Sequence, residues 1–157
     1  MRLWIVQHGD ALAKNVDPDR PLSEKGRSDV KRLASHLAGC GVRVERVVHS
    51  GKTRAQQTAG ILAAALRVGE RVEAVKNLDP LDPPGPFAAE CAFSAGDLLV
   101  AGHMPFVGKL VSFLTAAREE TTLLGFVPGA AACLEQADDG TWSVVCMLRP
   151  EFLPGDW

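Results

Sequence analysis

Two absences narrow the class of this protein before any motif is considered. The 157 residues contain no apolar run near the ~20 residues that a membrane-spanning helix requires. Neither charge sign dominates, because 17 lysines and arginines stand against 19 acidic residues, for a formal net charge of −2. The chain therefore lacks the basic surface that binds nucleic acid. We expect neither a membrane nor a nucleic acid as a partner.

Cysteine is sparse, and its spacing is irregular. The four cysteines are Cys40, Cys91, Cys133 and Cys146. Zinc sites and disulfide frameworks need paired spacings, which these positions lack. A reducing, cytoplasmic setting fits this pattern, and no cleaved leader is expected because Met1 and Arg2 lead directly into an apolar run. We also expect no metal and no cofactor.

The length of the chain predicts one domain over residues 1–157. A chain of this size buries roughly 70% of the surface that its unfolded form exposes, which is enough for a core without disulfides or metal. No internal repeat or low-complexity tract divides the sequence.

Short apolar runs bounded by turn residues predict strands. They cover Leu3–Val6, Val44–His49, Arg71–Val75, Asp97–Ala101, Ala130–Glu135 and Trp142–Met147, of which the last two form a hairpin.

Apolar residues at helical spacing predict helices between these strands. One helix follows a cap at Ser23, one follows a cap at Ser50, and one covers Phe106–Leu114. Asp79–Pro86, with its four prolines, is expected to be an irregular loop, and Phe87–Ser94 a poor helix or turn. The alternation predicts an α/β fold, a three-layer sandwich whose mainly parallel sheet is flanked by helices and carries an antiparallel edge strand.

Chemically useful residues follow three of the predicted strands. His8 and Gly9 follow the first, Ser50 and Arg54 follow the second, and His103 follows the strand over 97–101. The carboxyl ends of parallel strands share one edge of a sheet, so His8, Arg54 and His103 can converge there although they are far apart in sequence. The pattern therefore predicts an active site at that edge.

Four short segments carry a family resemblance. They are Gln7–Asp10, Arg20–Ser23, Ser50–Thr58 and Gly102–Pro105. In this order and context they resemble the motifs of the histidine phosphatase superfamily, and within it those of the small SixA-type phosphohistidine phosphatases. The resemblance extends over almost the whole chain and implies the histidine phosphatase fold.

The resemblance also implies roles for individual residues. His8 would be the nucleophile, since a neutral imidazole attacks phosphorus and carries it as a transient phosphohistidine. Arg54 and Arg20 would hold phosphoryl oxygens through forked contacts. His103 would be a further catalytic donor, most effective when protonated. The implied phosphate-binding set is Gln7, Gly9, Arg20, Arg54 and His103.

Two departures from the family pattern bear on activity. Gln7 stands where the family has arginine; it keeps donors for phosphate but loses a positive charge and the fork geometry. The region where the family often places a carboxylic acid reads Lys76–Asp79 and holds no glutamate, so Asp79 or Asp82 is the candidate proton donor.

The expected function is that of a phosphatase acting on protein phosphohistidine, with a phosphorylated protein such as a histidine phosphotransfer domain as partner and inorganic phosphate as product. The connections are nearly minimal, which predicts a shallow site open to a protein surface. Imidazole is a good leaving group, so a weak acid or water suffices. Two alternatives stay open: a catalytically weakened phosphate or phosphoprotein-binding module, and a phosphomonoesterase acting on a small metabolite.

The other histidines are given simpler interpretations. His49 is expected to be structural or merely near the site, and His36 to be solvated on a polar helix face. A metal site built from His8, Asp10, His49 and His103 is disfavoured because the arginines would oppose a cation.

Overall fold

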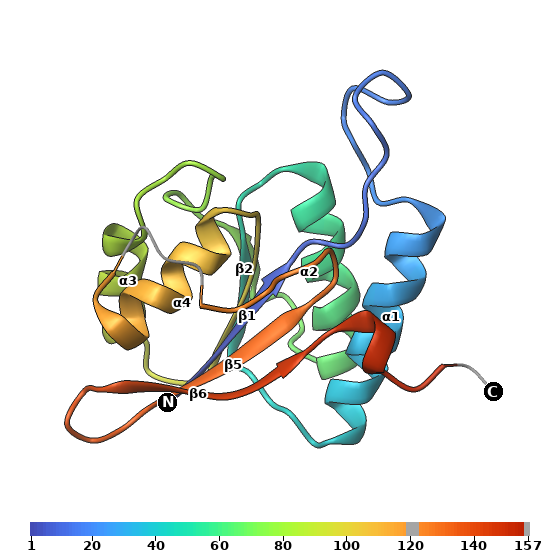
Figure 1. Cartoon of the computed structure of the whole chain (residues 1–157). Helices are drawn as coiled ribbons and strands as arrows, with labels where there is room; N and C mark the ends of the chain where they lie inside the picture. Colours follow the sequence, from blue (N-terminus) through green and yellow to red (C-terminus); the bar gives the residue numbers. More distant parts are fainter. Residues whose placement is uncertain (119–122, 156–157) are drawn as a thin grey trace.

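One six-stranded sheet organises the molecule (Figure 1). The computed structural model describes residues 1–118 and 123–155. Its strands are β1 (Arg2–Gln7), β2 (Arg46–His49), β3 (Val72–Ala74), β4 (Leu98–Gly102), β5 (Ala131–Gln136) and β6 (Trp142–Leu148), in the spatial order β3-β2-β4-β1-β5-β6. The first four run parallel, whereas β5 is antiparallel to both β1 and β6. The predicted mainly parallel sheet is confirmed.

Helices cover both faces of this sheet. α1 (Glu24–Gly39) and α2 (Thr53–Leu66) pack on one face, and α3 (Pro84–Ala92) and α4 (Phe106–Ala116) on the other (Figure 1). Successive side chains of a strand point to opposite faces, so β1 serves both cores. Its Trp4 and Val6 join the core with α1 and α2, while Leu3 and Ile5 join the core with α3 and α4. No helix in the described part of the chain is long and apolar enough to cross a bilayer.

The helix starts differ in part from the sequence predictions. The Ser23 cap is confirmed, because its side chain accepts a hydrogen bond from the Gly26 N–H at 3.0 Å. The predicted cap at Ser50 is wrong. α2 begins at Thr53, and its N-cap residue is Lys52, whose side chain makes no capping hydrogen bond. α3 begins at Pro84, inside the segment expected to be irregular, because proline suits the first turn of a helix. A 3-10 turn at Pro150–Phe152 was not predicted.

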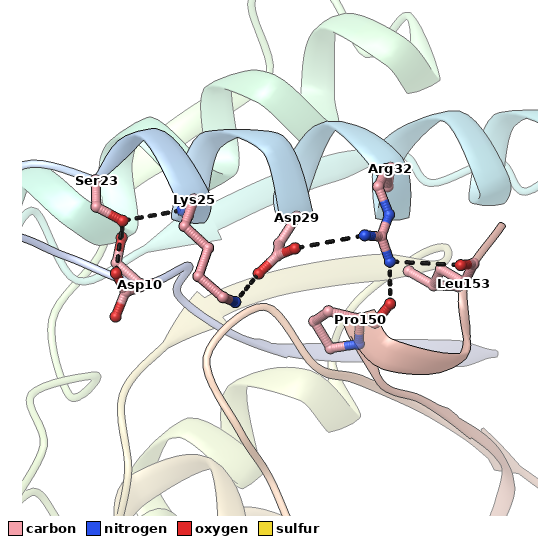
Figure 2. Close-up of polar contacts among 8 residues, drawn as sticks. Asp10, Ser23, Lys25, Asp29, Arg32, Pro150 and Leu153 are labelled. Carbon is pink, nitrogen blue, oxygen red and sulfur yellow. Dashed lines mark hydrogen bonds and ion pairs between the residues drawn. The ribbon is translucent and has the colours of Figure 1, made fainter. Parts of the chain in front are cut away.

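The start of α1 is fixed against the loop that follows β1. The Ser23 hydroxyl donates to Asp10 Oδ2 at 2.5 Å, and the Ser23 N–H donates to the Asp10 carbonyl at 2.9 Å (Figure 2). Gly26 lies directly against the Asp10 backbone. The segment after β1, which includes His8, and the first turn of α1 therefore meet backbone to backbone.

A buried carboxylate joins α1 to the chain after β6. Asp29 lies between Lys25 Nζ at 2.5 Å and Arg32 Nη1 at 3.7 Å (Figure 2). The other end of the Arg32 guanidinium donates to the carbonyls of Pro150 and Leu153. Two cations compensate the buried negative charge, and one of them fastens the 3-10 turn onto α1.

We predict that Gly26→Ala destabilises the protein by about 2 kcal/mol or more. A Cβ at this position would lie 2.0 Å from the Asp10 carbonyl oxygen, a backbone atom that cannot rotate away. Urea unfolding measures the change. Gly39→Ala is the matched control in the same helix, because a Cβ there meets nothing within 4 Å. The control should be neutral or stabilising by up to about 1 kcal/mol, and equal losses in both variants would contradict the prediction.

Candidate active site

Two histidine rings meet where β1 and β4 end. Gln7 pairs with Gly102 in the parallel register, so His8 and His103 each follow their strand by one residue. The ring centroids are 5.0 Å apart, and the His8 N–H donates to the Gly102 carbonyl at 2.9 Å. The structure thus brings together, at the carboxyl edge of the sheet, two residues separated by most of the chain.

The tautomer of His8 follows from its hydrogen bonds. Nδ1 lies 2.7 Å from the Gly9 carbonyl, which can only accept, so Nδ1 carries the proton. Nε2 is left with its lone pair and accepts from Arg54 Nε at 3.2 Å. Burial lowers the pKa of His8, and the positive charges of Arg54 and Arg20 lower it further, against the opposing effect of the Gly9 bond. The ring is therefore held neutral with Nε2 facing the guanidinium.

Arg54 and Arg20 reach His8 from different parts of the chain. Arg54 lies in the first turn of α2. Arg20 comes from the loop after β1 in a left-handed conformation, φ 48°, and its Nε donates to the Leu12 carbonyl at 3.1 Å. Burial lowers the pKa of Arg54, and the Arg20 charge lowers it further, so the two cations lie within each other's field. Within residues 1–118 and 123–155 neither arginine forms an ion pair, which leaves both charges available to an anion.

His103 is the more buried of the two histidines, at 1% exposure. Burial, followed by the neighbouring His8, Arg54 and Lys52, lowers its pKa to about 3. Its Nε2 lies 2.6 Å from the Ser50 hydroxyl, and its buried Nδ1 has no partner in the described chain. Burial and the surrounding cations thus favour the neutral ring of His103. Negative charge beside the ring, such as that of a bound anion, would raise this pKa.

Two residues of α2 connect the segments that carry His8, Arg20 and Arg54. The sequence motifs did not predict this positioning role. The fully buried Thr58 hydroxyl accepts from the Gly9 N–H at 3.1 Å and donates to the Arg54 carbonyl at 2.8 Å. Gln57 Oε1 accepts from the Leu22 N–H at 2.8 Å, just beyond Arg20. In the sequence, the signal for Thr58 is a hydroxyl side chain within the apolar stripe of the helix, one turn after Arg54.

An ion pair marks the rim of the site. Lys52 Nζ lies 3.1 Å from Asp79 Oδ1, and the negative charge of Asp79 acts on the pKa of His103 in the raising direction. Of the two candidate proton donors, Asp79 is therefore the one near the histidines. Asp82 turns its carboxylate back to the Asp79 N–H at 2.9 Å, within its own loop.

Gln7 is buried at the end of β1, where the family has arginine. Its Oε1 is enclosed and has no hydrogen-bond partner among the described residues. A buried acceptor without a donor is costly, so this position holds an unmet hydrogen-bonding capacity next to His8.

The remaining histidine at this edge is structural. His49 Nδ1 accepts from the Gly51 N–H at 3.1 Å. The Asp10 carboxylate accepts from the Ser23 hydroxyl. In residues 1–118 and 123–155 no three histidine, cysteine, aspartate or glutamate side chains gather as a metal ion would require.

Comparison with known proteins places this geometry in a family. The model of the histidine phosphatase superfamily (branch 1) matches residues 3–82, which include His8, Arg20 and Arg54. The chain is also 30% identical over 148 residues to phosphohistidine phosphatase SixA of Escherichia coli, covering 91% of each protein. The chain belongs to the histidine phosphatase superfamily. Its fold and sequence make it a phosphatase, a hydrolase of phosphoryl groups.

Solved structures of histidine phosphatases superpose on the whole fold. The tungstate complex of the protein histidine phosphatase SixA gives a TM-score of 0.85 at 28% identity, covering 96% of this chain and 97% of that one. The alpha-ribazole phosphatase of Shigella flexneri gives 0.79 at 16% identity, covering 96% and 97%, and shows the shared fold alone. Histidine phosphatases with different named substrates thus share this architecture.

The depressed pKa of His103 predicts an acid-sensitive fold. Below pH 6.5 the unfolded chain protonates this side chain, whereas the folded protein does not until about pH 3, so stability is lost as the pH falls through this window. From pH 7 to pH 5 this one group should cost about 2 kcal/mol. Urea unfolding at the two pH values should show a smaller loss for His103→Gln than for the wild type. His36→Gln, on α1, controls for the removal of a histidine as such, and parallel losses in all three proteins would contradict the prediction.

Proposed function

We propose that this histidine phosphatase removes phosphoryl groups from protein phosphohistidine through a covalent phosphohistidine on His8. The observation that carries the proposal is the neutral His8 ring, whose Nε2 lone pair accepts from Arg54 and which lies in the field of both Arg54 and Arg20. Neither arginine forms an ion pair in the described chain. The 30% identity to phosphohistidine phosphatase SixA supports the choice of substrate. A histidine phosphotransfer domain is the expected kind of partner, and the setting is cytoplasmic signalling by protein dephosphorylation.

The first step transfers the phosphoryl group. The His8 Nε2 lone pair forms a bond to phosphorus while the bond from phosphorus to the substrate imidazole breaks, and its electron pair stays on the departing nitrogen. Arg54, which occupies Nε2 in the free enzyme, turns to the phosphoryl oxygens, where Arg20 and His103 also contribute donors. The developing negative charge is thus held by groups already in place.

The second step returns the enzyme to its starting state. Water attacks the phosphorus, the bond to His8 Nε2 breaks, and inorganic phosphate leaves with the proton balance completed by solvent. The Gly9 carbonyl keeps the proton of His8 on Nδ1 throughout, so Nε2 is regenerated as the nucleophile.

The leaving group accounts for the modest acid machinery of the site. An alkoxide leaving from a phosphate ester needs a strong proton donor, whereas an imidazole leaving from phosphohistidine is readily protonated. The only carboxylate that we assign to this task is Asp79, which lies at the rim in an ion pair with Lys52. This arrangement favours a phosphorus to nitrogen bond over the ester of a small metabolite.

We predict that His8→Ala abolishes phosphate release and the formation of acid-labile phosphate on the enzyme. Arg54 and Arg20 remain in this variant and can still bind phosphate, but they cannot form the intermediate. Quenched-flow trapping with a phosphohistidine protein, set against a phosphoserine peptide, measures both quantities. His36→Ala is the control and should behave as the wild type. Undiminished hydrolysis by His8→Ala, or preference for the phosphoserine peptide, would contradict the proposal.

Substitutions of Gln7 distinguish an active enzyme from a catalytically weakened binding module. We predict that Gln7→Arg tightens vanadate binding and raises kcat/KM, by at most about a hundredfold, or about 3 kcal/mol. Gln7→Lys restores the charge without the fork and should gain less, while Gln7→Met removes the amide donor and should lose activity. Measurable turnover in the wild type with a modest gain in Gln7→Arg fits an enzyme. A wild type that is inert until arginine is introduced would support the binding module instead.

A further inference from the structure

Ser50 is a polar residue at the carboxyl edge of the sheet that takes no part in the two reaction steps. β2, β4 and β1 are neighbours in the sheet, and Ser50, His103 and His8 each follow one of these strands by one residue. His103 follows the middle strand. Its Nε2 lies 2.6 Å from Ser50 Oγ, and its ring centroid lies 5.0 Å from that of His8. Ser50 is thus in direct contact with one of the two histidines of the site.

The direction of the hydrogen bond between Ser50 and His103 follows from the other partner of the hydroxyl. Ser50 Oγ accepts from the Lys52 N–H at 3.4 Å, and a backbone N–H can only donate. In the described part of the chain, His103 Nε2 is the other polar atom within hydrogen-bond distance of Oγ, so the hydroxyl proton points at it. His103 Nε2 therefore accepts with its lone pair.

This direction fixes the tautomer of His103. The pKa of His103 is lowered to about 3, so near pH 7 the ring is neutral and holds one proton. Because Nε2 accepts, the proton is on Nδ1. Nδ1 is enclosed and has no hydrogen-bond partner in residues 1–118 and 123–155. It is therefore a buried donor that no described residue of the chain satisfies.

The place of Ser50 is set by the helix that carries Arg54. Lys52, whose N–H contacts Ser50, is the N-cap residue of α2, and its carbonyl accepts the first hydrogen bonds of that helix. Its side chain is held in the ion pair with Asp79 at 3.1 Å. The start of α2 thus positions both Arg54, the partner of His8, and the hydroxyl that contacts His103.

We infer that Ser50 is a positioning residue for the phosphatase reaction, whose hydroxyl fixes the His103 ring and directs the ring proton to Nδ1. The inference rests on the proposed function in one respect, the role of His103 as a donor to the phosphoryl group. A neutral imidazole donates only from the nitrogen that carries its proton, and the hydrogen bond at the other nitrogen decides which one that is. Ser50 makes that hydrogen bond.

The first test reads the tautomer in the free enzyme by NMR, since the ¹⁵N chemical shifts of the ring distinguish a protonated nitrogen from an unprotonated one. The wild type should show Nδ1–H for His103. Ser50→Ala should show the proton on Nε2 or divided between both nitrogens, because Nε2 has then lost its donor. Ser50→Thr keeps a hydroxyl and should keep the wild-type tautomer.

Ser94→Ala is the matched control. Ser94 is also half-buried and donates one side-chain hydrogen bond, to the Gly96 carbonyl at 3.1 Å. It precedes the amino end of β4, whereas His103 follows the carboxyl end of the same strand. This variant should leave the His103 tautomer and the activity unchanged.

The second test measures phosphate release from a histidine phosphotransfer domain phosphorylated on its histidine. Ser50→Ala should lower kcat about tenfold and leave KM within about threefold, because a donor to the transferring group is misplaced while the arginines still bind phosphate. Ser50→Thr should restore kcat to within about twofold of the wild type. A role of Ser50 in stability alone would not change the tautomer.

An Nε2–H ring in the wild type, or the same tautomer in Ser50→Ala as in the wild type, would overturn the inference. An equal fall of kcat in Ser50→Ala and Ser50→Thr, or in Ser94→Ala, would overturn it as well. The wild-type spectrum decides even if Ser50→Ala fails to fold. A wild type that releases no phosphate from the phosphorylated domain would overturn the proposed function instead, and the tautomer comparison, which needs no substrate, would still decide whether Ser50 sets the proton of His103.

Discussion

The hydrogen bond from the Gly9 N–H to the buried Thr58 hydroxyl is the contact on which the site depends. The same hydroxyl donates a hydrogen bond to the Arg54 carbonyl. One side chain therefore fixes the end of β1 relative to the first turn of α2. His8 precedes Gly9, and its Nε2 meets Arg54 Nε at 3.2 Å. Without this link the positions of His8 and Arg54 would be set separately by the end of β1 and by α2.

The electrostatics of the site favour the binding of an anion. Two arginines lie in each other's field without forming an ion pair in the described chain, and burial with cationic neighbours lowers the pKa of both His8 and His103. In the proposed mechanism, a transferring phosphoryl group would relieve the repulsion between the arginines and give the neutral rings a negative partner. The cost of holding like charges together in the free enzyme is offset when the phosphoryl group binds, which is how a preorganised site stabilises charge that develops during reaction.

The proposed function gives this site a large substrate with a labile bond. The loop over residues 11–21 is anchored by the hydrogen bond from Arg20 to the Leu12 carbonyl, and the loop over residues 75–83 by the ion pair of Asp79 with Lys52. Gln7 removes one charge from the usual set, which lowers the affinity available from phosphate alone. Under the proposed function, contacts outside the phosphate site would then matter more for substrate binding.

The amino-acid sequence by itself determined the α/β architecture, the order of strands and helices along the chain, the Ser23 cap and the identity of His8, Arg20, Arg54 and His103 as candidates. These follow from local periodicity, from turn residues and from short motifs at strand ends, all of which are written in neighbouring residues. The misplaced Ser50 cap shows where local reasoning stops. A serine shortly before a helix is a good N-cap in isolation. The Ser50 hydroxyl instead forms a hydrogen bond with His103, which lies 53 residues away in the chain.

Only the tertiary structure decided the protonation states of the two histidines and the contacts that position the residues of the site. The pKa of His103 depends on burial, on the neighbouring His8 and on the cations Arg54 and Lys52 at the start of α2. The positioning role of Thr58 depends on the packing of α2 against the end of β1. Likewise, the ion pair of Asp79 with Lys52 singles out Asp79 from Asp82, although the two are three residues apart in the same loop. Such effects fall off over a few ångströms and join residues distant in the chain, so they arise only once the sheet has brought those residues to one edge.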